Sequence, residues 1–323
     1  MRIMLANPRG FCAGVHMAVD IVDQLLDVIS EDEQLYVFHE IVHNRHVVDR
    51  LRTKGAIFVE SIEAIPEGST VVFSAHGVSP TIRAQANARN LTAIDATCPL
   101  VTKVHNEAIR YADRNWQILL IGHKNHQEIL GTAGEAPNHI QIVESPADIE
   151  KLHIIDPNKL VYLTQTTLST DDADVIIAAL KKAFPTIQSP PTDDICYATT
   201  NRQQIIREQA SIADVVLVVG SQNSSNSLRL TEIAESAGTK AHLLDDVTHL
   251  QKDWLQHANT VLVTAGASAP EHLVGEIVQQ LIHEYDGVLE PSEPFNENMT
   301  FSMPVSLQNF LERRDVTIRG EQQ

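Results

Sequence analysis

Three cysteines are the residues of this 323-residue chain whose type and spacing most clearly indicate chemistry. Cys12, Cys98 and Cys196 each stand directly before a stretch of helical pattern, in GFCAGVHMAVDIV, ATCPLVTKVHNEAI and DICYATTNRQQII. The odd number excludes a disulfide framework. A thiol at the start of a helix lies in a field that favours the anionic sulfur. If the three thiolates converge on one point, they would form a metal site.

Two kinds of metal site fit three thiolates. Because the sequence has no CxxC pair, a structural zinc site with four protein ligands is disfavoured, while a zinc ion with three protein ligands and an open water position remains an alternative. A cubane iron–sulfur cluster on the same cysteines would leave one iron without a protein ligand. That iron is free to act as a Lewis acid on a substrate oxygen.

Histidines and short polar side chains follow the predicted strands and suit an anionic ligand. His43, His76 and His126 each stand where a strand is expected to end. A histidine beside an anion can be held protonated and donate a charge-assisted hydrogen bond worth about 1.5–3 kcal/mol. Short neutral donors suited to phosphate oxygens at a helix start are Ser224, Ser225, Asn226 and Ser268. Ordinary helix capping is the alternative for these four, and both roles can coexist.

Glu128 is the candidate proton donor. It stands two residues after His126, and besides Glu40 it is the only carboxylate in these polar clusters. A carboxyl group with a tuned pKa can act as a general acid, and Thr166 and Thr167 could relay its proton or position a substrate hydroxyl. The alternative is an acid in the first turn of a helix, where the dipole favours it.

Short apolar runs rich in Val, Ile and Leu alternate with longer amphipathic stretches, which predicts an α/β fold. Runs that are apolar throughout indicate parallel strands buried on both faces. The strands expected are Tyr36–Phe38, Val71–Phe73, Ile118–Ile121, Val161–Leu163, Val215–Val219 and Val261–Thr264. The helical patterns between them include Val15–Ile29, Val101–Asn115 and Arg202–Ala213.

The order of these elements repeats three times, with a cysteine and helix leading to two strong strands that each end in a polar cluster. The cysteine stands 31, 28 and 30 residues before a residue of the first cluster, which is His43, His126 or Asn226 in the three copies. It stands 64, 68 and 72 residues before a residue of the second cluster, which is His76, Thr166 or Ser268. Ligands bind beyond the carboxyl ends of parallel strands. Three such modules around a pseudo-threefold axis would therefore direct every cluster into one central cavity.

The same repeat predicts a closed trefoil of three modules. The second and third cysteines follow strand-like segments, whereas the last copy ends in a helix near Tyr285 with no strand after it. We therefore expect Arg2–Ala6 to supply the missing strand of the third module, paired with the Val215 or the Val261 strand. Beyond about Glu290 we expect an irregular wrap and a mobile polar terminus. The expected modules are residues 14–96, residues 97–193, and residues 1–13 with 194–323.

Composition restricts the possible partners. The formal charge is −18, from 24 Lys and Arg against 42 Asp and Glu, which argues against nucleic acid and against stable association with an anionic membrane. No apolar run approaches the roughly 18 residues of a membrane span, and the polar N-terminus does not resemble a signal peptide. We expect a cytoplasmic protein with an aliphatic core, because aromatic residues make up only 5% of the chain.

The motifs NPRGFCAGV, SAHGV, DATCPLV, HQEILGTAGE, TQTTLS, GSQNSSN and TAGASAP occur in this order and resemble the LytB family. Its members are hydroxymethylbutenyl diphosphate reductases, which act last in the methylerythritol phosphate route to isoprenoids. The resemblance runs from Asn7 to about Pro304, and it implies a trefoil around a central [4Fe–4S] cluster. The chain departs from the usual family pattern at Gln127 and at Gln222, and neither change removes an implied ligand or acid.

The resemblance also implies residue roles. Cys12, Cys98 and Cys196 would ligate the cluster, whose apical iron binds the substrate's allylic oxygen. Glu128, working with Thr166, would supply the proton that lets the hydroxyl leave as water, and Thr167 would line the same pocket. The diphosphate would be held by His43, His76, His126, Ser224, Ser225, Asn226 and Ser268.

The implied reaction takes two electrons, delivered singly by flavodoxin or ferredoxin, and gives isopentenyl and dimethylallyl diphosphate together. Two other functions remain as alternatives to this reductase. One is a zinc-dependent hydrolase or lyase acting on a phosphorylated metabolite. The other is a redox sensor that binds a phosphometabolite without transforming it.

Overall fold

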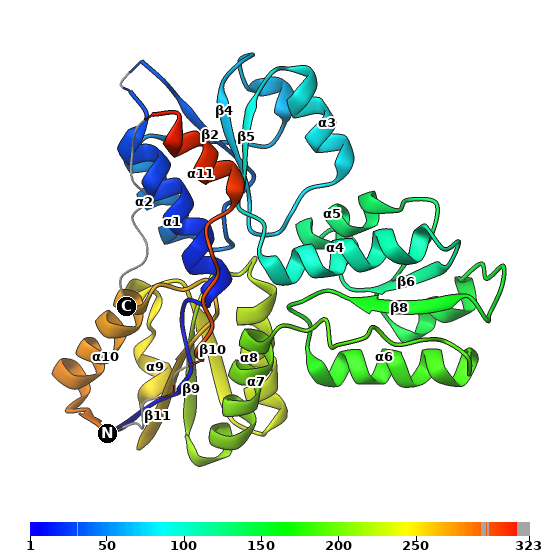
Figure 1. Cartoon of the computed structure of the whole chain (residues 1–323). Coiled ribbons are helices and arrows are strands. Elements are labelled where there is room, and N and C mark those ends of the chain that lie inside the picture. Colours follow the sequence, from blue (N-terminus) through cyan, green and yellow to red (C-terminus); the bar gives the residue numbers. More distant parts are fainter. Residues whose placement is uncertain (31, 292–294, 296, 315–323) are drawn as a thin grey trace.

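The computed structural model describes residues 1–30, 32–291, 295 and 297–314. Figure 1 shows three lobes that meet near the middle of the molecule, each built on its own sheet. All pairings between neighbouring strands are parallel. The expected α/β architecture of three parallel-sheet modules is thereby confirmed. The residue boundaries given above for the modules stay a prediction.

Module 1 is built on a four-stranded sheet with the order β3-β2-β4-β5. Its strands are β2 (Leu35–Phe38), β3 (Ala56–Val59), β4 (Thr70–Phe73) and β5 (Thr92–Asp95). Its helices are α1 (Ala13–Val28), α2 (Arg45–Thr53), α3 (Pro80–Ala88) and the short 3-10 helix η1 (Ile62–Ala64).

Module 2 has the smallest sheet, with the order β7-β6-β8. Its strands are β6 (Gln117–Ile121), β7 (Ile140–Val143) and β8 (Leu160–Thr164). Its helices are α4 (Pro99–Ala112), α5 (Gln127–Glu135), α6 (Thr170–Ala183) and the 3-10 helix η2 (Pro146–Lys151). The strand-like segment before the third cysteine contributes one isolated parallel bridge, between Gln188 and Val161.

Module 3 has five strands in the order β10-β9-β11-β1-β12. The strands are β1 (Arg2–Leu5), β9 (Val215–Val219), β10 (Lys240–Leu244), β11 (Thr260–Ala265) and β12 (Val288–Leu289). The helices are α7 (Tyr197–Gln209), α8 (Ser225–Ser236), α9 (Lys252–Leu255), α10 (Glu271–Tyr285), η3 (Ala210–Ile212) and η4 (Val247–His249).

The N-terminal strand closes the ring as the sequence predicts. Ile3 in β1 lies opposite Val261 in β11, so the first residues of the chain complete the last sheet. Backbone hydrogen bonds continue this pairing beyond the strand, from the N–H of Gly10 to Ala265 at 3.2 Å and from that of Cys12 to Ala267 at 3.2 Å. The loop that leads to the first cysteine is therefore held by module 3.

The chain after α10 differs from the irregular wrap expected beyond Glu290. That expectation is wrong for Val305–Glu312, which form a final helix, α11. Leu307, Phe310 and Leu311 share one face of this helix and are buried in the core of module 1. The C-terminal segment therefore runs from module 3 to module 1, as the red helix beside α1 shows in Figure 1.

The described helices are short. The longest, α1, has 16 residues, and none in the described part of the chain is both long and apolar enough to cross a membrane. The mobile terminus expected from the sequence includes residues 315–323, which lie outside the described residues.

The strands are apolar because both faces of each sheet are covered. Every residue of β2, β8 and β9 is buried, as expected for parallel strands with helices on both sides. Polar side chains therefore gather where the strands end. The residues that follow β2, β4, β6, β8, β9 and β11 all contribute to one central cavity.

Candidate active site

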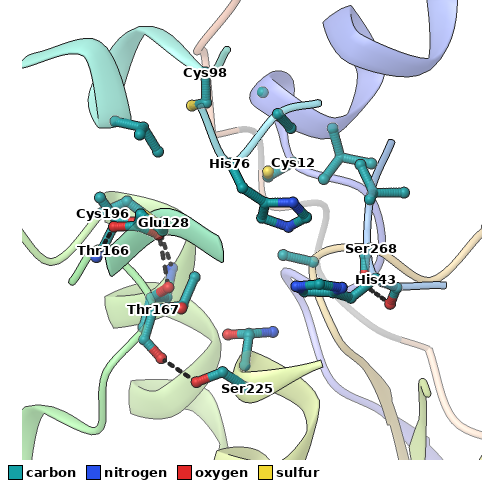
Figure 2. Close-up of a pocket in the computed structure, with 18 of the residues that line it drawn as sticks. Cys12, His43, His76, Cys98, Glu128, Thr166, Thr167, Cys196, Ser225 and Ser268 are labelled. Carbon is teal, nitrogen blue, oxygen red and sulfur yellow. Dashed lines mark hydrogen bonds between the residues drawn. The ribbon is translucent and has the colours of Figure 1, made fainter. Parts of the chain in front are cut away.

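One cavity between the three modules gathers every site residue expected from the sequence (Figure 2). Three cysteines, three histidines, a carboxyl group and a set of small polar side chains line it. They are Cys12, His43, His76, Cys98, His126, Glu128, Thr166, Thr167, Cys196, Ser224, Ser225, Asn226 and Ser268. Because each module contributes to the wall, the cavity exists only in the assembled trefoil.

The three cysteines occupy equivalent positions in the fold. Cys12, Cys98 and Cys196 are the N-cap residues of α1, α4 and α7, and all three are free thiols. Gly14 allows two of these helices to approach closely, because a Cβ at this position would lie 2.6 Å from Sγ of Cys98. Among the described residues, no group of three or more His, Cys, Asp or Glu side chains forms a recognisable site for a metal ion.

Burial opposes ionisation of the three cysteine thiols. Burial raises the pKa of Cys98 to about 12 and that of Cys196 to about 11, and the charge of Cys12 adds to both shifts. Burial also raises the pKa of Cys12, against hydrogen bonds from the backbone of α1 and the charge of Arg202. Burial therefore outweighs the helix N-termini at these thiols, and an electrophile such as a metal ion would favour the thiolate.

The three histidine rings contact one another. The rings of His43 and His76 are stacked with centroids 4.0 Å apart, and the ring of His126 lies 5.3 Å and 5.7 Å from them. Burial lowers the pKa of His126 to about 3 and that of His76 well below its usual value, with charge repulsion between the rings as the next cause. Burial therefore favours the neutral form of both rings, and an anion between them would favour protonation.

Asn226 presents an unpartnered amide to the cavity. The residue is 3% exposed, and neither Nδ2 nor Oδ1 has a hydrogen-bond partner among the described residues. Ser224 caps α8 by accepting from the N–H of Ser227 at 3.3 Å, so the capping alternative holds for this serine. A buried amide without a partner costs free energy, so a polar ligand that satisfies it would be stabilised here.

Ser268 ties module 3 to module 1 at the cavity wall. Its hydroxyl donates to the carbonyl of His43 at 2.9 Å and lies 3.5 Å from Oγ of Ser224. His43 is further oriented by Glu40, whose Oε2 lies 3.2 Å from Nδ1 of its ring. The hydrogen bond with His43 lowers the pKa of the Glu40 carboxyl, despite its partial burial.

Glu128 lies in the first turn of α5 and is 2% exposed. Both of its oxygens accept hydrogen bonds from Thr166, as the dashed lines in Figure 2 show. Burial raises the pKa of Glu128 to about 7; the Thr166 hydrogen bonds lower it in part, and the charge of Asp194 raises it further. This carboxyl group can therefore hold and release a proton near neutral pH.

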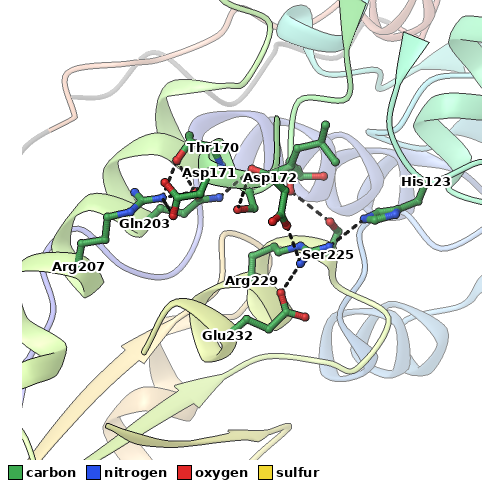
Figure 3. A network of polar contacts seen from close by, with 12 residues as sticks. His123, Thr170, Asp171, Asp172, Gln203, Arg207, Ser225, Arg229 and Glu232 are labelled. Carbon is green, nitrogen blue, oxygen red and sulfur yellow. Dashed lines mark hydrogen bonds and ion pairs between the residues drawn. The ribbon is translucent and has the colours of Figure 1, made fainter. Parts of the chain in front are cut away.

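A polar network joins modules 2 and 3 beside the cavity (Figure 3). Arg229 on α8 pairs with Asp172 on α6 at 3.0 Å and lies 3.4 Å from Nε2 of His123, the second residue after β6. In the same network the hydroxyl of Ser225 donates to the carbonyl of Thr167 at 3.2 Å. Two of the expected substrate-binding residues are therefore in direct contact across the boundary between modules.

Two residues of α7 support the site but are absent from the set expected from the sequence. The N–H of Thr199 lies 3.4 Å from Sγ of Cys196, a capping contact that its position three residues later could have indicated. Arg202 has a wholly buried guanidinium that donates to the carbonyl of Gly10 at 2.8 Å and pairs with Glu297 at 3.0 Å. No pattern in the sequence links Arg202 to Gly10 or to Glu297.

Fold and cavity together define a class of protein: three parallel-sheet α/β modules whose strand ends surround free thiols, histidines and one protonatable carboxyl. A sequence model described as "LytB protein" matches residues 3–282. The chain belongs to the LytB family. Membership in this family implies an iron–sulfur cofactor in general terms.

Two similar proteins are named for the same enzymatic activity. A Mycobacterium bovis relative, "4-hydroxy-3-methylbut-2-enyl diphosphate reductase 1", is 50% identical over 95% of this chain and 92% of its own. A relative from Mycobacterium sp. (strain KMS), "4-hydroxy-3-methylbut-2-enyl diphosphate reductase", is 51% identical over 94% of this chain and 91% of its own.

Solved structures agree with this fold. The E-1-hydroxy-2-methyl-but-2-enyl-4-diphosphate reductase from Plasmodium falciparum has a TM-score of 0.90 and 38% identity, covering 97% of this chain and 99% of its own. A second, (E)-4-hydroxy-3-methyl-but-2-enyl diphosphate reductase, is described as the terminal enzyme of the non-mevalonate pathway. It has a TM-score of 0.61 and 27% identity, covering 87% of this chain and 99% of its own.

Proposed function

We propose that this chain reduces 4-hydroxy-3-methylbut-2-enyl diphosphate to isopentenyl diphosphate and dimethylallyl diphosphate, the last step of the non-mevalonate (methylerythritol phosphate) route to isoprenoids. One observation carries the proposal: a single cavity holds three free thiols, three histidines and a buried carboxyl group. These groups suit a redox centre, a diphosphate and a proton transfer. The reaction takes up two electrons and two protons and releases the hydroxyl group as water.

Cys12, Cys98 and Cys196 would hold one [4Fe–4S] cluster per chain, with one iron left without a protein ligand. The donor set fits, because three unpaired thiols from equivalent helix N-termini line one cavity, and Gly14 leaves room for the Cys98 sulfur. When bound, such a cluster supplies electrons one at a time and a Lewis-acidic iron. The three cysteines would give up their thiol protons when they bind the cluster, because metal ligands must be deprotonated.

His43, His76 and His126 would bind the diphosphate together with the amide of Asn226 and the neighbouring serines. Burial favours the neutral form of His76 and His126, so an entering diphosphate would raise their pKa values and gain charge-assisted hydrogen bonds. The unpartnered Nδ2 of Asn226 can donate a further hydrogen bond to a phosphate oxygen. This local charge would offset the acidic character of the whole chain, which has a formal charge of −18.

Glu128 would supply the proton that converts the departing hydroxyl group into water. With a pKa of about 7 it is protonated in a large share of molecules at neutral pH. Thr166 holds the carboxyl through both oxygens, and Thr167 lies beside it in the cavity wall. Addition of the second proton at either end of the three-carbon allylic system accounts for the two products.

The electrons would come from a one-electron carrier protein, flavodoxin or ferredoxin, and the protein would work in the cytoplasm. Free cysteines favour a reducing compartment, where a thiol-bound cluster persists. The acidic balance of the chain argues against nucleic-acid partners and against stable membrane association.

Anaerobic purification followed by metal analysis and turnover tests the proposal. The expected protein is brown, contains iron and acid-labile sulfide in about equal amounts, and forms both products when supplied with a low-potential reductant. A colourless protein with one zinc per chain would overturn the cofactor and favour a hydrolase or lyase. A cluster-loaded protein that binds the diphosphate without reducing it would instead favour a redox sensor.

A further inference from the structure

Behind the cavity wall, two buried side chains and a partly exposed arginine form a polar cluster that the proposed reaction does not use. Nδ1 of His105, on α4, lies 2.9 Å from Oε1 of Glu135, on α5, and Arg83, on α3, pairs with the same oxygen. The side chains of His105 and Glu135 are 6% and 4% exposed. Arg83 also donates to the carbonyl of Val78 at 2.9 Å. We call His105, Glu135 and Arg83 the triad.

The triad has a defined hydrogen-bonding direction. Burial opposes ionisation of Glu135, but hydrogen bonds from His105 and Arg83 outweigh it and hold the pKa of this carboxyl below its usual value. An ionised carboxylate only accepts, so Nδ1 of His105 donates the hydrogen bond. Nε2 of the same ring is buried and has no hydrogen-bond partner among the described residues. The ring is therefore oriented by Glu135 alone.

His105 lies directly beneath the turn that carries His76. The N–H of Gly77 donates to Ser74 at 3.1 Å to close this turn, and Gly77 has a φ of +78°. A Cβ at Gly77 would lie 3.0 Å from Cε1 and 3.2 Å from Nε2 of His105. The imidazole ring therefore supports the backbone of the turn at van der Waals distance, with no space for another side chain between them.

The same cluster fixes the helix that carries the proposed proton donor. Glu128 lies in the first turn of α5, and Glu135 is the last residue of that helix. Halfway along, a Cβ at Gly131 would lie 3.2 Å from the carbonyl oxygen of Gly77, so α5 packs directly on the turn. A Cβ at Gly134 would overlap Ser79, which caps α3. Close packing of this kind transmits a displacement of one element to the other.

We propose that His105, held by Glu135, with which Arg83 also pairs, is a positioning residue that sets the His76 turn against α5 and so fixes His76 relative to Glu128. This inference rests on the proposed function, because it assigns the triad to the geometry of that site. The triad spans modules 1 and 2, the two modules that contribute these residues. Loss of the Nδ1 hydrogen bond would leave Glu135 with an unpaired buried lone pair and free the ring to rotate.

Substitution of His105 in the cluster-loaded enzyme tests this assignment. His105→Leu removes the hydrogen bond at similar volume, whereas His105→Asn keeps an N–H donor near the position of Nδ1. Leu180→Ala is the matched control, because Leu180 is fully buried in module 2 but does not line the cavity. For each protein, kcat and KM are measured together with the Kd for inorganic diphosphate, at a temperature where circular dichroism shows a folded chain.

The expected result separates positioning from general destabilisation. His105→Leu lowers kcat/KM by roughly 10- to 100-fold, as small displacements in a catalytic site do, and weakens diphosphate binding. His105→Asn restores both values to within about threefold of wild type, because the oriented donor is retained. Leu180→Ala lowers the melting temperature but changes neither value.

Three results would overturn the assignment of His105: wild-type kinetics and diphosphate affinity in His105→Leu, equal impairment in His105→Asn and His105→Leu, or the same impairment in Leu180→Ala. Failure of the wild-type chain to turn over the substrate would overturn the proposed function instead. In that case the diphosphate titration still decides whether His105 positions the His76 turn.

Discussion

Thr166 donates to both oxygens of the Glu128 carboxyl, with its N–H 2.6 Å from Oε1 and its hydroxyl 2.9 Å from Oε2. Two donors from one residue fix the plane of the carboxyl group, while burial keeps its pKa near 7. The carboxyl group therefore has a fixed orientation and a pKa that lets it gain or lose a proton near neutral pH.

Replacement of Glu128 by glutamine removes the acid but keeps the volume and the oxygen that accepts from the Thr166 N–H. We expect kcat to fall at least about 100-fold, a typical contribution of general acid catalysis, while iron content and KM change little. Steady-state kinetics with iron analysis measures both. Glu107→Gln is the control, because this carboxyl group on α4 also has a raised pKa but does not line the cavity. Substantial turnover by Glu128→Gln would refute the role.

The raised pKa of Glu128 also makes folding depend on pH. This carboxyl has a pKa of about 7 in the folded chain, against an ordinary value of 4.5. Between these values the unfolded chain loses the proton first, so the free energy of unfolding decreases as pH rises, by about 3 kcal/mol from this group. The contribution is fully present below pH 4.5 and is lost above about pH 7.

Urea unfolding of the cluster-free protein at pH 5 and pH 8 measures this dependence. We expect Glu128→Gln to lose stability less steeply with pH than wild type, because the glutamine does not ionise. Parallel pH dependences in the two proteins would contradict the raised pKa.

Asn226→Leu distinguishes a ligand-binding amide from a structural one. Because neither polar atom of this amide has a partner in the described residues, an apolar side chain of similar size should leave the ligand-free melting temperature unchanged or raise it. Diphosphate affinity should fall about tenfold with the loss of one hydrogen bond to a charged group. Calorimetric titration with inorganic diphosphate measures the affinity.

Asn44→Leu is the control for this substitution. Asn44 is also fully buried, but its Oδ1 accepts from the N–H of Val47 at 3.1 Å and caps α2. We expect this variant to lower the melting temperature without changing diphosphate affinity. Equal effects of the two leucine substitutions would argue that Asn226 has only a structural role.

Gly14→Ala tests the space around the proposed cluster ligands. The new methyl group would lie 2.6 Å from Sγ and 3.3 Å from Cβ of Cys98, so the cysteine must move. We expect less iron per chain and a changed visible spectrum, with helical content unaffected. Gly275→Ala on α10 is the control, because a Cβ there meets nothing within 4 Å and should stabilise the helix by up to about 1 kcal/mol. Full iron content in Gly14→Ala would show that the close approach of Gly14 to Cys98 is not needed for cluster binding.

The sequence predicts the contents of the cavity well because of one property of parallel sheets. Side chains just after buried strands must meet where the strand ends converge, so spacing in the chain translates into position in space. His43, His76 and His126 illustrate this, since they follow β2, β4 and β6 and form one group of rings. The pairing of β1 with β11 follows from the same repeat, which leaves one strand missing in the last module.

Features that depend on packing between distant segments were beyond sequence reasoning. An eight-residue helix such as α11 is marginal alone, and it forms here because Phe310 and its neighbours are buried in module 1. The raised pKa values of the thiols also could not be expected from the helix dipoles, since they result from burial in the assembled cavity. His105 and Glu135 are 30 residues apart, and no pattern in the chain links them.

The position of β1 determines when the protein can mature during its synthesis. β1 leaves the ribosome before its partner β11, which begins only at Thr260, so β1 cannot pair with β11 until translation has passed this residue. The loop that ends at Cys12 is fixed only at the same stage, because its backbone is hydrogen-bonded to Ala265 and Ala267. Module 2 can fold as it emerges, but the core of module 1 is completed by α11, and the three thiols assemble only after β11 has been translated. Insertion of a cofactor on all three thiols would therefore follow the synthesis of β11.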